Sequence, residues 1–119
     1  MAAITKRLLS GSTSGKGIKL TGGTNSAAAV EVHTAIAGAT DFDEIWLWVT
    51  NTSTAGVKLT LEWGTATAVD GNIEVTIPPE EGLMQVAPGL ILNGGMVVEA
   101  FASAADVLLI FGFVNRIDY

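Results

Sequence analysis

The sequence predicts a single all-β domain, an antiparallel β-sandwich that we expect to be jelly-roll-like with an extended N-terminal arm. From residue 30 onward, apolar and polar residues alternate with a period of two, which is the pattern of half-buried strands. Turn-forming Gly, Pro, Asn and Asp residues interrupt this pattern about every 8–12 residues. No window combines a helical period with helix start and stop signals. The 119 residues suit one domain.

The strands are predicted one after another along the chain. They cover residues 18–20, 30–34, 45–49, 57–63, 72–77, 83–86, 90–92, 96–101 and 107–114. Residues 57–63 alternate most cleanly, which predicts one buried and one solvated face, with Glu62 on the solvated one. Residues 45–49 are apolar on both faces, as expected of a central strand. Residues 51–56 are predicted to form a hairpin loop, because Asn and Gly tolerate turn geometry.

The predicted strand set suits two sandwich topologies. A jelly roll is the first expectation and an immunoglobulin-like sandwich is the second, since both are built from about seven to nine short strands. Immunoglobulin domains often carry a Cys…Trp…Cys spacing, and this chain has no cysteine. Without cysteine, neither disulfides nor thiolate-bound metals stabilise the fold. Stability is therefore expected from apolar burial and β hydrogen bonds.

The charge distribution divides the chain into a basic arm, residues 1–29, and an acidic β-sandwich body, residues 30–119. The net charge is −6, yet all twelve acids lie in the body. The basic residues of the arm are Lys6, Arg7, Lys16 and Lys19. Residues 10–30 consist largely of Gly, Ser, Thr, Asn and Ala, which favours a flexible or extended segment. Such asymmetry is typical of an arm that docks on an acidic surface, although a basic tail without a role is the alternative.

The low charge content indicates that a partner covers part of the surface. Hydrophobic residues make up 49% of the chain and charged residues only 15%, below the usual quarter. Trp46 and Trp48 alternate with the aliphatic residues of segment 45–49, so both point outward if the aliphatic face is core. Two outward tryptophans would form a subunit interface or a platform for sugars, and a second buried layer is the equal alternative. Trp63 is expected in the core.

No motif for catalysis, a cofactor or a metal stands out, and we expect a protein that is not an enzyme. In a phosphate-binding loop four residues separate the first glycine from Gly-Lys, and a Ser or Thr follows. Here only three residues separate Gly11 from Gly15-Lys16, and Gly17 stands where the Ser or Thr belongs. The acidic body disfavours nucleic-acid binding. The longest apolar run, residues 107–114, is too short for a transmembrane helix, so we expect no membrane partner.

Titratable residues outside the arm are expected at the surface. His33 is the only histidine, and the strand alternation puts it on the polar face without a nucleophile motif beside it. Glu31 shares that face. Asp41, Asp43 and Glu44 precede a strand and are predicted to form a solvated acidic turn rather than a calcium site.

Four segments carry a resemblance to a known family. They are residues 4–9 (ITKRLL), 43–52 (DEIWLWVTNT), 86–95 (VAPGLILNGG) and 111–117 (FGFVNRI). In these segments the chain resembles small structural proteins encoded among the head genes of tailed bacteriophages, and in particular the capsid decoration, or cement, proteins. The shared motifs are strands and turns, so no functional residue is carried over.

The resemblance implies a virion protein on the outer surface of the capsid. Such proteins bind the major capsid protein, often as homotrimers at local threefold positions, and brace the shell against internal DNA pressure. Trp46 and Trp48 are then expected at the subunit interface, while the arm becomes ordered on the capsid. The arm residues expected to contact the capsid are Ile4, Lys6, Arg7, Leu8, Leu9, Lys16 and Lys19. The alternative is a carbohydrate-binding β-sandwich module of a phage fibre or spike.

Overall fold

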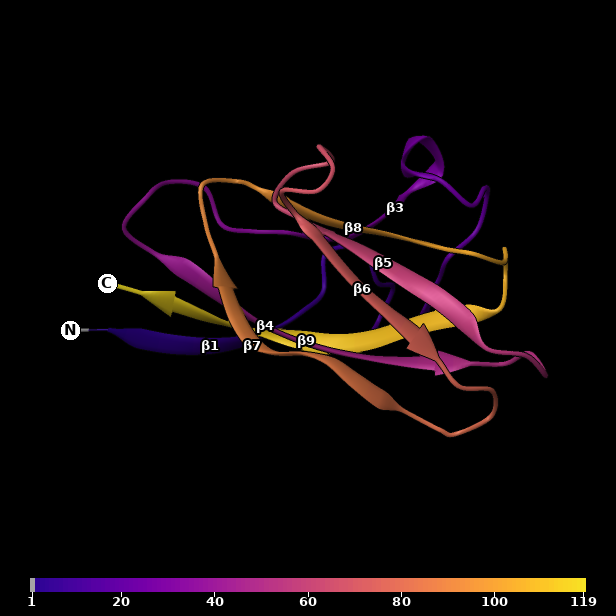
Figure 1. Cartoon of the computed structure of the whole chain (residues 1–119). Helices are drawn as coiled ribbons and strands as arrows, with labels where there is room; N and C mark the ends of the chain where they lie inside the picture. Colours follow the sequence, from indigo (N-terminus) through magenta and orange to yellow (C-terminus); the bar gives the residue numbers. More distant parts are fainter. Residues whose placement is uncertain (1) are drawn as a thin grey trace.

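The computed structural model describes residues 2–119, and these form two antiparallel sheets that face each other (Figure 1). Sheet A contains β1 (Ala3–Leu8), β2 (Ile18–Lys19), β4 (Phe42–Asn51), β7 (Met84–Leu92) and β9 (Leu108–Asp118). Sheet B contains β3 (Val30–Thr34), β5 (Val57–Trp63), β6 (Asn72–Ile77) and β8 (Val97–Ala102). A 3₁₀ turn, η1 (Ser26–Ala28), precedes β3. The predicted all-β class is confirmed, with no α-helix among the described residues.

The strand order is β1-β9-β4-β7 in sheet A and β3-β8-β5-β6 in sheet B, and β2 also pairs with β9. Consecutive strands from β2 onward lie in opposite sheets, except that β5 pairs with β6. The predicted hairpin at residues 51–56 is therefore wrong, because this loop carries the chain from sheet A to sheet B. Asn51 holds the crossing in place. Its side-chain amide is buried and donates to the carbonyls of Ala55 and Ile77, at 2.8 and 2.9 Å.

The core lies between the two sheets and follows the predicted alternation. The aliphatic residues of β4 and β5 are fully buried, and Trp63 packs against them at the edge of the core. Thr60 and Glu62 depart from the prediction, since both point to the outer side of sheet B yet are buried. The Ser26 hydroxyl of η1 donates to Glu62 Oε2 at 2.6 Å, so the segment around η1 reaches over this part of sheet B.

The N-terminal segment is integrated into the sandwich, which differs from the predicted separation between an arm at residues 1–29 and a body. Strand β1 pairs with β9 along its whole length, as the edge strand of sheet A. Leu9, Ile18 and Leu20 are core residues. Their burial explains the difference, because three large apolar side chains anchor a segment whose Gly and Ser content suggested flexibility. Met1 lies outside the described residues.

A buried polar cluster joins the two sheets. His33 of sheet B lies 2.7 Å from Asp43 Oδ2 of sheet A, measured from its Nε2. Arg116 donates to the same carboxylate through Nε at 2.8 Å and Nη2 at 3.1 Å. The backbone amide of Ser10 donates to His33 Nδ1 at 3.0 Å, so Nε2 carries the ring proton and donates to Asp43. One carboxylate therefore connects both sheets and the N-terminal segment.

This cluster corrects two predictions. His33 and Asp43 were expected in solvent, but both are buried. A β-bulge between Glu31 and His33 breaks the strict alternation and turns His33 inward. Burial by itself raises the pKa of Asp43, but the hydrogen bonds from Arg116 and His33 outweigh it and hold the pKa below its usual value of 3.8. The cluster bridges the two sheets, and beside it the Ser10 hydroxyl donates to Glu31 and accepts from the Thr34 amide.

We predict that Asp43→Asn lowers the free energy of unfolding at neutral pH by about 3–5 kcal/mol, because Arg116 loses its buried counter-charge. Urea unfolding measures this change, with Glu81→Gln in an exposed loop as the control. Because the folded-state pKa of Asp43 is lowered, its contribution is present above pH 3.8 and is lost as the pH falls through the folded-state value. The difference between wild type and variant should therefore shrink in acid. A difference that stays constant down to the folded-state pKa would contradict this role.

Candidate interaction face

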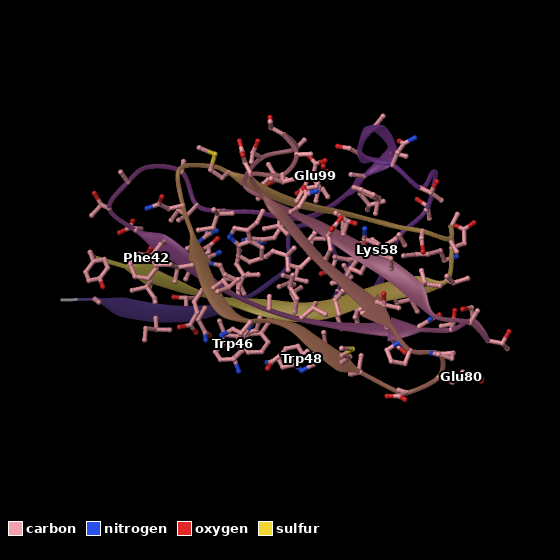
Figure 2. The ribbon with its side chains drawn as sticks, viewed as in Figure 1. Phe42, Trp46, Trp48, Lys58, Glu80 and Glu99 are labelled. Atoms are coloured by element: carbon pink, nitrogen blue, oxygen red, sulfur yellow. The ribbon has the colours of Figure 1, made fainter. Side chains whose placement is uncertain are left out.

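The outer surface of sheet A gathers the aromatic residues of two central strands. On β4, Ile45, Leu47 and Val49 point into the core, so Trp46 and Trp48 point outward, which is one of the two alternatives that the sequence left open. Figure 2 shows both indoles on the side of β4 that faces away from sheet B. The face that we call the aromatic face consists of Lys6, Leu8, Trp46, Trp48, Phe111 and Phe113.

Phe113 lies at the centre of the aromatic face. Its ring stacks against Trp46 at a centroid distance of 6.2 Å and an interplanar angle of 11°. It also stacks against Trp48 at 6.0 Å and 22°. The ammonium group of Lys6 lies 4.8 Å from the Phe113 ring centroid, within the range of a cation–π interaction. These contacts join Trp46, Trp48 and Lys6 around the ring of Phe113.

Trp46 is held by polar contacts at its edge and by a close backbone approach. Its indole N–H donates to Glu44 Oε1 at 2.7 Å, and the Asn115 amide donates to the same oxygen at 3.1 Å. The bonds from Asn115 and Trp46 lower the pKa of Glu44, which keeps this acceptor ionised. On the other side, Gly89 of β7 has φ +79°, and a Cβ atom there would lie 2.7 Å from the indole. Both its backbone conformation and its contact with Trp46 require glycine.

The structure brings together residues that the sequence assigned to two separate contacts. Ile4, Lys6 and Leu8 of the predicted capsid-contact arm lie opposite Ile117, Asn115 and Phe113 of β9, and therefore on the same side of sheet A as the tryptophans. Ile4, Lys6 and Leu8 from the predicted arm contact therefore lie on one surface with Trp46 and Trp48, which were predicted as a subunit interface.

The remaining arm residues lie elsewhere or at the rim. Leu9 is only 2% exposed and belongs to the core, so the predicted capsid contact of Leu9 is wrong. Arg7 points to the opposite side of β1, where it lines a hollow with His33 and Arg116. Lys16 and Lys19 are exposed, and Lys19 pairs with Leu109 at the β2 edge of sheet A.

Phe111 and Phe113 complete the aromatic face, and the sequence analysis did not single them out. Their signal was present in the alternation of segment 107–114, where Leu108, Ile110 and Val114 are buried and the two phenylalanines fall between them. Their proximity to the tryptophans depends on the register, which pairs Trp46 with Phe113 and Trp48 with Phe111.

Exposed apolar residues extend the aromatic face toward both edges of sheet A. Ile4 is 69% exposed, Leu8 57% and Ile91 of β7 57%. A contiguous surface of this kind is typical of a protein–protein contact. The basic residues Lys6 and Lys19 lie along the β1 and β2 edge.

Comparisons with protein-family models, with curated proteins and with solved structures found no match to this chain. Within residues 2–119 no helix is long and apolar enough to cross a membrane.

We predict that Gly89→Ala destabilises the protein by about 1–3 kcal/mol more than Gly82→Ala, as measured by urea unfolding. Both glycines have positive φ, +79° and +73°, so both substitutions strain the backbone. Only the Cβ atom at position 89 meets the indole of Trp46, whereas nothing lies within 4 Å of a Cβ at Gly82. In a Trp46→Ala background the excess cost of Gly89→Ala should disappear. If the excess persists there, the indole is not its cause.

Proposed function

We propose that this chain is a structural virion protein that binds the outer surface of a tailed-phage capsid and stabilises the shell. The observation that carries the proposal is the aromatic face, which joins the outward tryptophans to the exposed apolar and basic residues of β1 on one side of the sandwich. It agrees with the resemblance to capsid decoration proteins, which rests on segments of β1, β4, β7 and β9. These four strands form sheet A together with the short strand β2.

The strand order supports the jelly-roll topology that we propose for the fold. Jelly rolls consist of eight strands in two sheets with two Greek keys, and they occur in viral capsid proteins and lectins. Here β1-β9-β4-β7 faces β3-β8-β5-β6, and the chain crosses between the sheets at most of its connections. This arrangement places the first and last long strands, β1 and β9, side by side in the sheet that carries the aromatic face.

Charge favours the capsid rather than a second aromatic face as the occupant of this surface. Lys6 and Lys19 line one edge of sheet A, while β7 at the other edge contains no acidic residue. If the aromatic faces of two copies packed together with β1 of one copy against β7 of the other, β7 would offer no carboxylate to Lys6 and Lys19. A shell surface with apolar residues and flanking carboxylates would satisfy both the rings and the lysines.

Strand β1 offers a second means of attachment. Among the described strands it pairs only with β9, so its outer edge carries free backbone N–H and C=O groups. All six residues of β1 are exposed. An extended segment of the major capsid protein that adds to this edge would form main-chain hydrogen bonds beside the aromatic face. Bridging two capsid subunits in this way would resist the outward pressure of packaged DNA.

We predict that Lys6→Glu weakens binding to phage heads assembled from the cognate major capsid protein by at least about 10-fold, since it reverses a charge that lies against the Phe113 ring within the contact. Co-sedimentation with heads that lack the decoration protein measures the affinity. Lys58→Glu is the matched control, because Lys58 lies on sheet B, where it pairs with Glu74 at 3.0 Å (Figure 2). Equal binding by Lys6→Glu and wild type would exclude the aromatic face as the capsid contact.

We also predict that the purified protein is a homotrimer with three times the monomer mass of 12.3 kDa. Such a trimer would match a threefold position on the shell and would cover further apolar surface. Light scattering after size exclusion measures the mass. A monomer that remains soluble when concentrated would contradict the trimer. It would not contradict the capsid contact of the aromatic face, which the co-sedimentation experiment tests separately.

The second candidate function is carbohydrate binding, as a module of a phage fibre or spike. It is favoured by the polar residues at the edge of Trp46, where Glu44 and Asn115 are placed to bond hydroxyl groups while the indole provides a stacking surface. Tryptophan fluorescence distinguishes the two functions. A glycan that protects the indoles from acrylamide quenching would favour carbohydrate binding.

A further inference from the structure

Three carboxylates lie in one row on the outer side of sheet B. Glu31 of β3 is directly opposite Glu99 of β8, and Glu99 is directly opposite Glu62 of β5. We call these three residues the carboxylate row. Like charges at directly opposite positions of neighbouring strands destabilise a sheet. Among residues 2–119, no lysine or arginine forms an ion pair with any of the three. The row therefore holds negative charge that the described chain does not neutralise.

Glu62 is the most constrained member of the row. Its side chain is only 2% exposed, and the Ser26 hydroxyl donates to its Oε2 at 2.6 Å. Its second oxygen, Oε1, is buried and has no hydrogen-bond partner. On the neighbouring strand, the amide oxygen of Asn72 is also buried without a partner, opposite Glu62. A buried acceptor without a donor is costly, and more so when it is ionised. This side of sheet B thus has an excess of acceptor oxygens.

A hollow opens beside Glu62. It has a volume of about 240 Å³ and lies between the turn that follows β5 and the turn that precedes β8. Glu62 and Glu99 line it together with Gly64, Thr65, Gly95 and Met96. Figure 2 shows Glu99 beside the loop that joins β5 to β6. Since one water occupies about 30 Å³ of liquid, the hollow has room for a cation that keeps several of its waters.

We propose that this hollow binds a calcium ion through Glu62 Oε1 and the carboxylate of Glu99. Calcium takes six to eight oxygen ligands in flexible geometry and accepts carboxylates, carbonyls and water together. The described residues contain no group of three His, Cys, Asp or Glu side chains that could hold a metal. The proposed site thus has two carboxylates, and water completes the coordination. With so few charged ligands we expect a dissociation constant at the weak end of the range for calcium sites, about 10⁻⁴–10⁻³ M.

The ion would neutralise the charges of Glu62 and Glu99, and the unpartnered oxygen of Glu62 would become one of its ligands. It would also link β5 to β8, and through Ser26 it would fix the segment around η1 that covers sheet B. The hollow lies on the sheet opposite the aromatic face, so calcium would stabilise the fold without contacting the surface proposed to bind the capsid. The two proposals can therefore fail independently.

The experiment measures calcium binding by isothermal titration calorimetry and thermal unfolding with and without about 10 mM CaCl₂. Wild type should bind with a dissociation constant of about 1 mM or tighter and gain about 5 °C in Tm. Glu99→Gln should bind at least about 10-fold more weakly, because it removes one of two carboxylate ligands. Glu81→Gln, in an exposed loop, should behave as wild type. MgCl₂ should shift Tm less, since magnesium demands stricter geometry.

A second measurement separates a metal site from a structural role of Glu99. Without calcium, Glu99→Gln should be at least as stable as wild type, because the substitution removes the charge repulsion with Glu62 and Glu31. Glu99 is only half-buried, so this variant avoids the folding risk of replacing Glu62. Wild type that shows neither binding heat nor a Tm shift with calcium would overturn the proposal. Equal calcium responses in Glu99→Gln and wild type would also overturn it.

Discussion

Strand β4 imposes the constraint on which the rest of the structure depends. It lies between β9 and β7 in sheet A, and successive side chains alternate between its two faces. Ile45, Leu47 and Val49 fill the core, and this fixes Trp46 and Trp48 outside it. A shift of one residue in register would exchange the two sets, burying the indoles and exposing the aliphatic chains. The aromatic face is therefore a direct consequence of the way the core closes.

The two sheets also depend on one buried carboxylate. Asp43 accepts hydrogen bonds from His33 of sheet B and from Arg116 of sheet A, and Ser10 connects the N-terminal segment to the same cluster through His33. Apolar packing between sheets is non-directional, whereas these bonds specify one relative position. The cluster lies close to the start of β4. Hydrogen bonds thus join the two sheets at the start of β4, and aliphatic side chains join them further along the strand.

The outer sides of the sandwich differ in chemistry. Sheet A presents stacked rings with lysines along one edge, whereas sheet B presents the carboxylate row and a hollow beside it. Folding brings this separation about, because β1 and β2 carry Lys6, Arg7 and Lys19 to sheet A, while all four strands of sheet B come from the acidic part of the chain, residues 30–119. The proposed contact surface and the proposed calcium site therefore lie on opposite sides of one small domain.

The sequence determined the class of fold and the orientation of individual strands, because alternation is a local property that each segment carries by itself. The placement of Trp46 and Trp48 on the face opposite Ile45, Leu47 and Val49 was predictable on this basis, and so was the burial of Leu59 and Leu61. The alternation did not show which face of segment 45–49 is core. Partners across strands were not, since register joins residues far apart in the chain. Only the tertiary structure therefore decided that Phe113 lies between the tryptophans, that a bulge turns His33 toward Asp43, and that Leu9 anchors a segment resembling a flexible arm. In each case a long-range contact outweighed the local preference, because burial or a buried hydrogen bond contributes more free energy than local propensity.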